Sequence, residues 1–181
     1  NQTGTDNTAI GYLALNADTG STNTAVGSRA LTLNSDGHSN TAMGAYALDA
    51  NTTGDWNVAI GKYALSSVQT TNSSTAVGTD ALTASTGEQN TAVGYQALRL
   101  NSTASQNVAM GFEASMTNET GTGNTAVGYR ALKANTNHGN TAVGYLALQT
   151  NTSASNCTAV GYNVLALNQA GDYNTAMGSQ A

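Results

Sequence analysis

The sequence predicts an all-β protein, a parallel β-solenoid of about eleven coils with 16–17 residues each. Three observations lead to this fold class. One nine-residue motif recurs eleven times, the copies are always 16 or 17 residues apart, and each copy has a glycine at the same place. A unit of this length is too short for a helical pair, which needs about 30 residues or more. It suits one coil of two or three short strands, which buries a core only by stacking on its neighbours.

The motif is clearest at residues 90–98, which read Asn-Thr-Ala-Val-Gly-Tyr-Gln-Ala-Leu. It recurs at 124–132 and 140–148, and looser copies begin at 7, 23, 40, 57, 74, 107, 157 and 174. We therefore expect residues 1–181 to form a single repeat array that is truncated within a repeat at both ends. Strands in a sheet lie about 4.7–4.9 Å apart, so ten to eleven coils would form a rod about 50 Å long.

A glycine follows the central alanine of the motif by two residues in every copy, and we expect it to form the corner of each coil. Its invariance within the array indicates a backbone that needs φ > 0, or an approach too close for any Cβ atom. The predicted corner glycines are Gly11, Gly27, Gly44, Gly61, Gly78, Gly94, Gly111, Gly128, Gly144, Gly161 and Gly178.

The residues on either side of the central alanine are β-branched or aliphatic, as a strand requires. Thr or Val precedes the alanine, and Ile, Val or Met follows it. These two positions share one side of the strand. Because Val58 and Val108 replace Thr, we expect this side to face the core and the alanine to face another sheet of the coil or another chain. After the corner we expect a second short strand, whose leucines stack in the core. Burial of each leucine should stabilise the fold by roughly 1.5–3 kcal/mol relative to exposure.

Asparagine opens nine of the eleven copies, and identical amides stacked along the axis can form a hydrogen-bonded ladder. Metal or sugar binding is the functional alternative. The ladder is favoured because Asn recurs in nearly every coil whereas no carboxylate does. The predicted ladder contains Asn7, Asn23, Asn40, Asn57, Asn90, Asn107, Asn124, Asn140 and Asn174.

Aromatic residues follow the corner glycine in five consecutive copies, and they form a second candidate binding feature of the sequence. They could present a platform to glycan rings, or they could stack at a coil edge or between chains with their polar tips in water. Stacking is favoured, because other copies carry polar residues such as Ser28 and Lys62 at this position. The predicted aromatic ladder consists of Tyr95, Phe112, Tyr129, Tyr145 and Tyr162.

Composition and motifs argue against several functional classes. Only 8% of the residues are charged and the net charge is −5, with no basic patch for nucleic acid. The apolar runs are too short for membrane insertion within this segment. His38 and His138 are interpreted as turn residues, Cys157 has no base nearby in the sequence, and the ten acids do not recur in register. We therefore predict no catalytic residue, no metal site, no cofactor and no enzymatic activity.

The Asn-Thr-Ala-Val-Gly core of the motif resembles the Asn-Ser-Val-Ala-Ile-Gly repeat in the heads of YadA-like trimeric autotransporter adhesins. Aligned on the glycine, Thr91, Ala92 and Val93 match the Val, Ala and Ile of that repeat. The array also looks like those of phage tail fibres and other surface fibres. The resemblance covers the whole chain and implies a left-handed parallel β-roll, three chains side by side and exposure outside a cell. The family's period is shorter, and the Tyr-x-Ala-Leu ending is not its usual one.

These observations predict a structural and adhesive fibre segment, an extracellular rod at a cell or virion surface. Its expected partners are copies of itself, as a homotrimer or an end-to-end fibre, and a cell-surface glycan or matrix protein. The alternatives are a receptor-binding or polysaccharide-binding tail-fibre segment, a polysaccharide-cleaving tail spike with paired carboxylates, and an ice-binding solenoid. Ice binding requires the threonine column to face solvent, and Val58 and Val108 argue for its burial.

Overall fold

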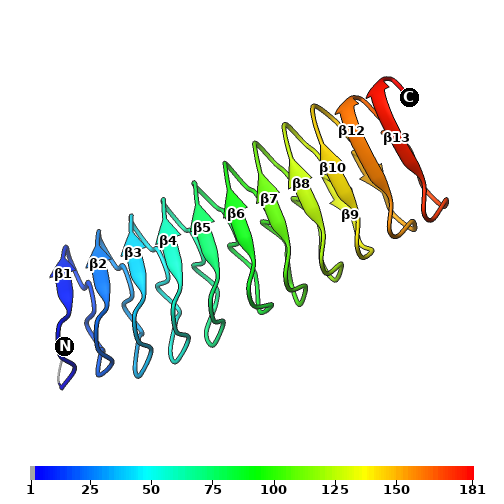
Figure 1. Ribbon diagram of the computed structural model, residues 1–181. Helices are drawn as coiled ribbons and strands as arrows, with labels where there is room; N and C mark the ends of the chain where they lie inside the picture. Colours follow the sequence, from blue (N-terminus) through cyan, green and yellow to red (C-terminus); the bar gives the residue numbers. More distant parts are fainter. Residues whose placement is uncertain (1–2) are drawn as a thin grey trace.

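The computed structural model describes residues 3–181, which form an elongated parallel β-solenoid (Figure 1). One eleven-stranded sheet contains β1 (Thr8–Ile10), β2 (Thr24–Val26), β3 (Thr41–Met43), β4 (Val58–Ile60), β5 (Thr75–Val77), β6 (Thr91–Val93), β7 (Val108–Met110), β8 (Thr125–Val127), β10 (Thr141–Val143), β12 (Thr158–Tyr162) and β13 (Thr175–Ser179). A second sheet pairs β9 (Ala134–Asn135) with β11 (Thr150–Asn151). The described residues contain no helix that could cross a lipid bilayer.

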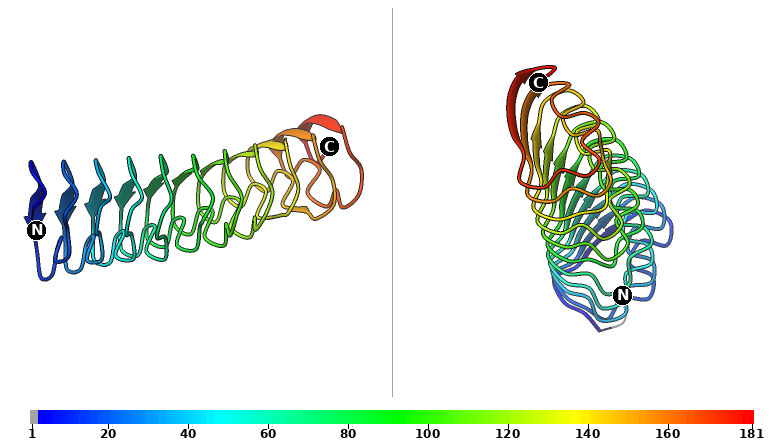
Figure 2. Two further views of the ribbon diagram at one scale, coloured as in Figure 1. Left: turned by 90° about the horizontal axis from the view of Figure 1, so that it is seen from below. Right: turned by 90° about the vertical axis from the view of Figure 1, so that its right-hand side faces the viewer.

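The strands of the large sheet pair in parallel and in the register of the repeat. Between β6 and β7, for example, Ala92 faces Ala109 and Val93 faces Met110. Each coil therefore lies directly on the next, and this confirms the predicted solenoid. Figure 2 shows that the two ends of the chain lie at opposite ends of the rod, and that the strand direction turns gradually along it. This turning is the ordinary twist of paired β-strands.

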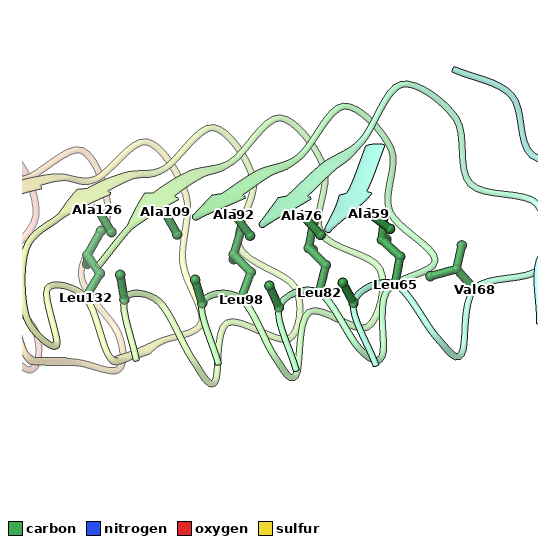
Figure 3. Packing of buried hydrophobic residues seen from close by; sticks show 14 of the residues in the cluster. Ala59, Leu65, Val68, Ala76, Leu82, Ala92, Leu98, Ala109, Ala126 and Leu132 are labelled. Carbon is green, nitrogen blue, oxygen red and sulfur yellow. The ribbon is translucent and has the colours of Figure 1, made fainter. Parts of the chain in front are cut away.

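The core contains the central alanine of each strand, and the expectation that the Thr or Val and the Ile, Val or Met beside it face the core is wrong. Ala92 and its counterparts from Ala25 to Ala159 are fully buried, whereas the flanking Thr and Val, Ile or Met side chains lie on the outer side of the sheet. Figure 3 shows these alanines pointing toward the leucine column across a narrow interior. The leucines are buried as predicted, for example Leu65, Leu98 and Leu132. Only a methyl group fits opposite them, which explains why alanine is invariant within the array.

A turn segment with alternating backbone handedness takes the place of the predicted second strand. The second and fourth residues after the corner glycine have positive φ in each coil, such as Gln96 at 55° and Leu98 at 49°. Their amides donate in opposite directions along the rod. The Gln96 amide bonds to the Thr79 carbonyl of the preceding coil, and the Leu98 amide bonds to the Ala114 carbonyl of the following coil, both at 3.0 Å. This backbone satisfies its polar groups between coils although it is not extended.

The corner glycines are required for both reasons that the sequence suggested. All eleven have φ between +126° and +138°, a region that is essentially restricted to glycine. They also lie directly on one another. A Cβ atom on Gly94 would meet the Gly111 carbonyl oxygen and lie 2.7 Å from its carbonyl carbon.

Two glycine-to-alanine substitutions separate these effects. Gly123 has φ +67°, and a Cβ atom added to it would have no heavy atom within 4 Å. Gly123→Ala should therefore lower the free energy of unfolding only by the cost of holding an alanine in the left-handed conformation, about 1–2 kcal/mol. Gly94→Ala adds a backbone clash and a more restricted φ, so it should cost at least about 3 kcal/mol. Denaturant unfolding measures both, and equal losses for the two variants would contradict this account of the corner.

Candidate functional site: the outer face of the sheet

The outer side of the eleven-stranded sheet is formed by two columns of side chains, which we call the outer face. The first column holds the residue before each central alanine: Thr8, Thr24, Thr41, Val58, Thr75, Thr91, Val108, Thr125, Thr141, Thr158 and Thr175. The second holds the residue after it: Ile10, Val26, Met43, Ile60, Val77, Val93, Met110, Val127, Val143, Val160 and Met177. Several members of the aliphatic column are substantially exposed, among them Met110 at 44% and Val143 at 36%.

The threonine hydroxyls of the outer face make no hydrogen bond within the described part of the chain. Threonines elsewhere bond to neighbouring coils. The Thr86 hydroxyl donates to the Ser102 carbonyl at 2.6 Å, and the Thr117 hydroxyl donates to the Lys133 carbonyl at 2.9 Å. The outer-face hydroxyls are therefore free to bond to water or to a partner. Neither column contains a charged residue.

The predicted aromatic ladder lies beside the aliphatic column as one continuous stack. Ring centroids of successive members, from Tyr95 to Tyr162, are 5.2, 5.4, 5.0 and 5.3 Å apart, with interplanar angles of 22° or less. The rings cover one another's faces and are partly exposed to solvent. A sugar ring stacks on an aromatic face, so this arrangement leaves room for such stacking only at the two ends of the ladder. The ring edges, in contrast, are available for contact with another chain.

A second, shorter aromatic stack lies on the turn segment that follows the corner. Tyr46 and Tyr63 have ring centroids 5.1 Å apart. The Arg29 guanidinium lies 5.6 Å from the Tyr46 ring centroid, and the Lys62 ammonium lies 4.9 Å from that of Tyr63. Cations at these distances are attracted to the ring face. This pair could not be recognised from the repeat, because the same position in the other coils holds Asp80 or another non-aromatic residue.

The predicted asparagine ladder lies inside the rod, where most of its members are buried. Its bonds run mainly from side chain to backbone. The Asn90 side-chain oxygen accepts from the Asn107 amide at 3.0 Å, and the Asn107 oxygen accepts from the Asn124 amide at 2.9 Å. The Asn90 side-chain nitrogen donates to the Ala104 carbonyl in the next coil at 2.8 Å. These amides are thus engaged in the interior, and they do not face an external ligand.

A second buried column lies seven residues after each corner glycine and contains Asp18, Asn34, Asn51, Val68, Ser85, Asn101, Asn118, Asn135, Asn151 and Asn168. Here amides do bond to amides, as Asn51 donates to the Asn34 oxygen at 2.7 Å. Asp18 is fully buried at the start of this column and accepts from Asn34 at 2.6 Å and from Asn7 at 2.8 Å. Burial raises the pKa of the Asp18 carboxyl, and the hydrogen bond from Asn34 partly opposes this rise.

Several acids and both histidines share a register after all, which corrects the expectation that the acids do not recur in register. His38, Asp55, Glu88, His138 and Asp172 each lie six residues before a corner glycine. The Nδ1 atoms of His38 and His138 accept from backbone amides of the preceding coil at 3.0 Å, and Asp55 and Asp172 accept in the same way at 2.7 Å. The position selects side chains with an acceptor, and it becomes visible when residues are counted backward from the next glycine.

The best-defined ion pairs join Glu113 to two cations on the next coil. The Glu113 carboxylate lies 2.8 Å from both the Lys133 ammonium and the Arg130 guanidinium. The hydrogen bond from Lys133 and that from Arg130 hold the pKa of Glu113 below its usual range. Within residues 3–181, no group of three or more His, Cys, Asp or Glu side chains could hold a metal ion. Cys157 is a buried member of the first asparagine column.

Comparison with protein-family models, curated proteins and solved structures finds no match to this chain.

Replacement of Asp18 by Asn should flatten the pH dependence of stability. Because burial raises the pKa of Asp18, the folded chain holds this proton more tightly than the unfolded chain. The parent's stability should then fall as the pH rises from acid, through the usual aspartate range, toward neutrality. Asp18→Asn removes this term, whereas Asp36→Asn, at an exposed site, should leave it unchanged. Urea unfolding between pH 3 and 7 measures the slopes, and identical slopes for parent and Asp18→Asn would contradict the assignment.

Proposed function

We propose that this chain is a non-enzymatic structural segment of an extracellular fibre, a stiff rod at a cell or virion surface that mediates attachment. The observation that carries the proposal is the in-register stacking of eleven equivalent coils along one axis, each supported by its neighbours. A fibre needs length and stiffness from few residues, and a solenoid provides both, because each coil adds one strand spacing to the axis.

The interior supports stiffness. A column of methyl groups and leucines fills the apolar half, and two columns of amides bond along the axis in the other half. Bending the rod would lengthen these bonds on one side at several coils together. Most of these buried amides are paired, and paired buried polar groups rigidify a structure. The side-chain oxygens of Asn51, Asn101 and Asn151 have no partner within the described residues, and such an unpaired group costs about 1–3 kcal/mol.

The surface supports attachment and self-association. The outer face and the aromatic ladder present the same groups at every coil, and a repeated surface allows many weak contacts to act together. Copies of the chain, arranged side by side or end to end, are the proposed partners, and the trimer implied by the adhesin resemblance is one such arrangement. A cell-surface glycan or matrix protein is the proposed target of the assembled fibre, and the tail-fibre alternative differs only in the surface that carries the rod.

Ice binding is a second candidate, because the threonine column faces solvent with free hydroxyls. The argument from Val58 and Val108 for burial fails, since that column lies outside. The condition set by the sequence is therefore met. However, a crystal plane is flat, whereas the strands turn along the rod (Figure 2), so a match to ice would be lost over a few strands. We rank ice binding below the fibre.

The fibre proposal is tested by the shape of the particle and by its binding. Small-angle scattering and negative-stain electron microscopy of the purified chain should show rods whose length is about 50 Å or a multiple of it. Rods immobilised on beads should retain the beads on cell or glycan surfaces more than beads coated with heat-denatured chain. A compact, roughly spherical particle would refute the proposal.

A thermal-hysteresis assay separates the second candidate from the first. We expect no hysteresis from the parent chain, because of the twist. Hysteresis that is abolished by Thr91→Tyr on the outer face, and kept by Thr103→Tyr at an exposed turn position, would instead establish ice binding.

A further inference from the structure

We infer that the outer face is the surface through which two copies of this chain pack against each other. The inference rests on the proposed function, in which copies associate, and it adds which surface they use. The sequence pointed to the aromatic ladder or the central alanines for contact between chains, and it placed the columns of the outer face in the core.

The aliphatic column of the outer face has no partner within the chain. Each of the eleven strands places an Ile, Val or Met on the solvent side of the sheet, and Ile60, Met43 and Met110 are 38%, 43% and 44% exposed. Contiguous apolar surface of this kind marks an interaction site, whereas single exposed residues do not. The pattern of β-branched and aliphatic residues that suggested burial is explained if the burial occurs between chains.

The outer face also has the area of a typical protein–protein interface. Eleven strands at the usual spacing extend about 50 Å, and the five residues from the threonine to the aromatic position extend about 16 Å, which gives about 800 Å². A standard protein–protein interface buries about 800 Å² on each partner. The outer face, together with the position after each corner glycine where the aromatic ladder lies in five coils, is therefore large enough for a stable interface if the partner covers its whole length.

A second copy of this chain is the partner that fits the outer face. A partner that contacts every strand must present side chains at the same axial spacing and follow the same twist, and an identical rod has both properties. The free hydroxyls on one copy can bond to those on the other. The two columns hold no charge, while the chain as a whole carries −5, so two copies repel each other least when these faces meet.

A pair of charge substitutions tests the interface. Val93→Lys with Val127→Lys places two ammonium groups on the outer face, and burying them unpaired is strongly unfavourable. The matched control, Thr103→Lys with Ser153→Lys, adds the same charge at two equivalent, exposed turn positions that do not lie on successive coils. Sedimentation velocity should show the parent and the control as oligomers, and the outer-face variant as a monomer of about 18.2 kDa. We expect its self-association to weaken on the order of 100-fold.

A cysteine variant keeps the test decisive if the lysine variant does not fold. Val93→Cys should form a disulfide between copies under mild oxidation, and Gln89→Cys should not. A parent that is monomeric at all concentrations, or equal cross-linking of the two cysteine variants, would overturn the inferred interface. Small-angle scattering distinguishes failure of the interface from failure of the fibre proposal. A monomeric rod would contradict only the interface, whereas a compact particle would contradict both.

Discussion

Each residue of this chain lies one strand spacing from its counterparts in the coils before and after it, and this proximity governs the rest of the structure. A position can hold only a side chain that tolerates its like at about 4.8 Å. Methyl groups, leucines, amides and aromatic rings meet that condition, and like charges do not. Along every column, no two successive coils carry the same charge, while Glu113 and Arg130 carry opposite charges. The low charge content thus follows from the geometry of stacking.

The interior divides into an apolar half and an amide half, and both are neutral. The apolar half is thin, because alanine methyl groups face leucines and nothing larger fits between them (Figure 3). The amide half takes over hydrogen bonds that a continuous sheet would have made. At the turn, the Ala104 carbonyl accepts at 2.8 Å from both Asn90 and Asn101, which belong to successive coils. The coil can therefore be narrow while the carbonyl groups at such turns are satisfied, although the side-chain oxygens of Asn51, Asn101 and Asn151 have no partner within the described residues.

The period, the corner glycines, the leucine core and the first asparagine column could be predicted from the sequence, because each repeats at a fixed interval. The sidedness of the strand could not, because Val58 and Val108 indicate the shape of a side chain and not its burial. The sequence does contain one pattern that indicates the turn segment after the corner. β-Branched residues fill the strand positions but never the second or fourth position after the glycine, where φ is positive and such residues are strained. The shared register of His38 and Asp55 was hidden by the variable length of the preceding segment.

That variable segment has an evolutionary consequence. Residues bond to the same coil or to the coils beside it, so one unit can be gained or lost by unequal genetic exchange without a change in any distant contact. Each event would alter the reach of the molecule by a single increment of about 4.8 Å and leave its cross-section unchanged. Length is thus a quantity that selection can adjust in small steps, as on a ruler, independently of the chemistry that the surface displays.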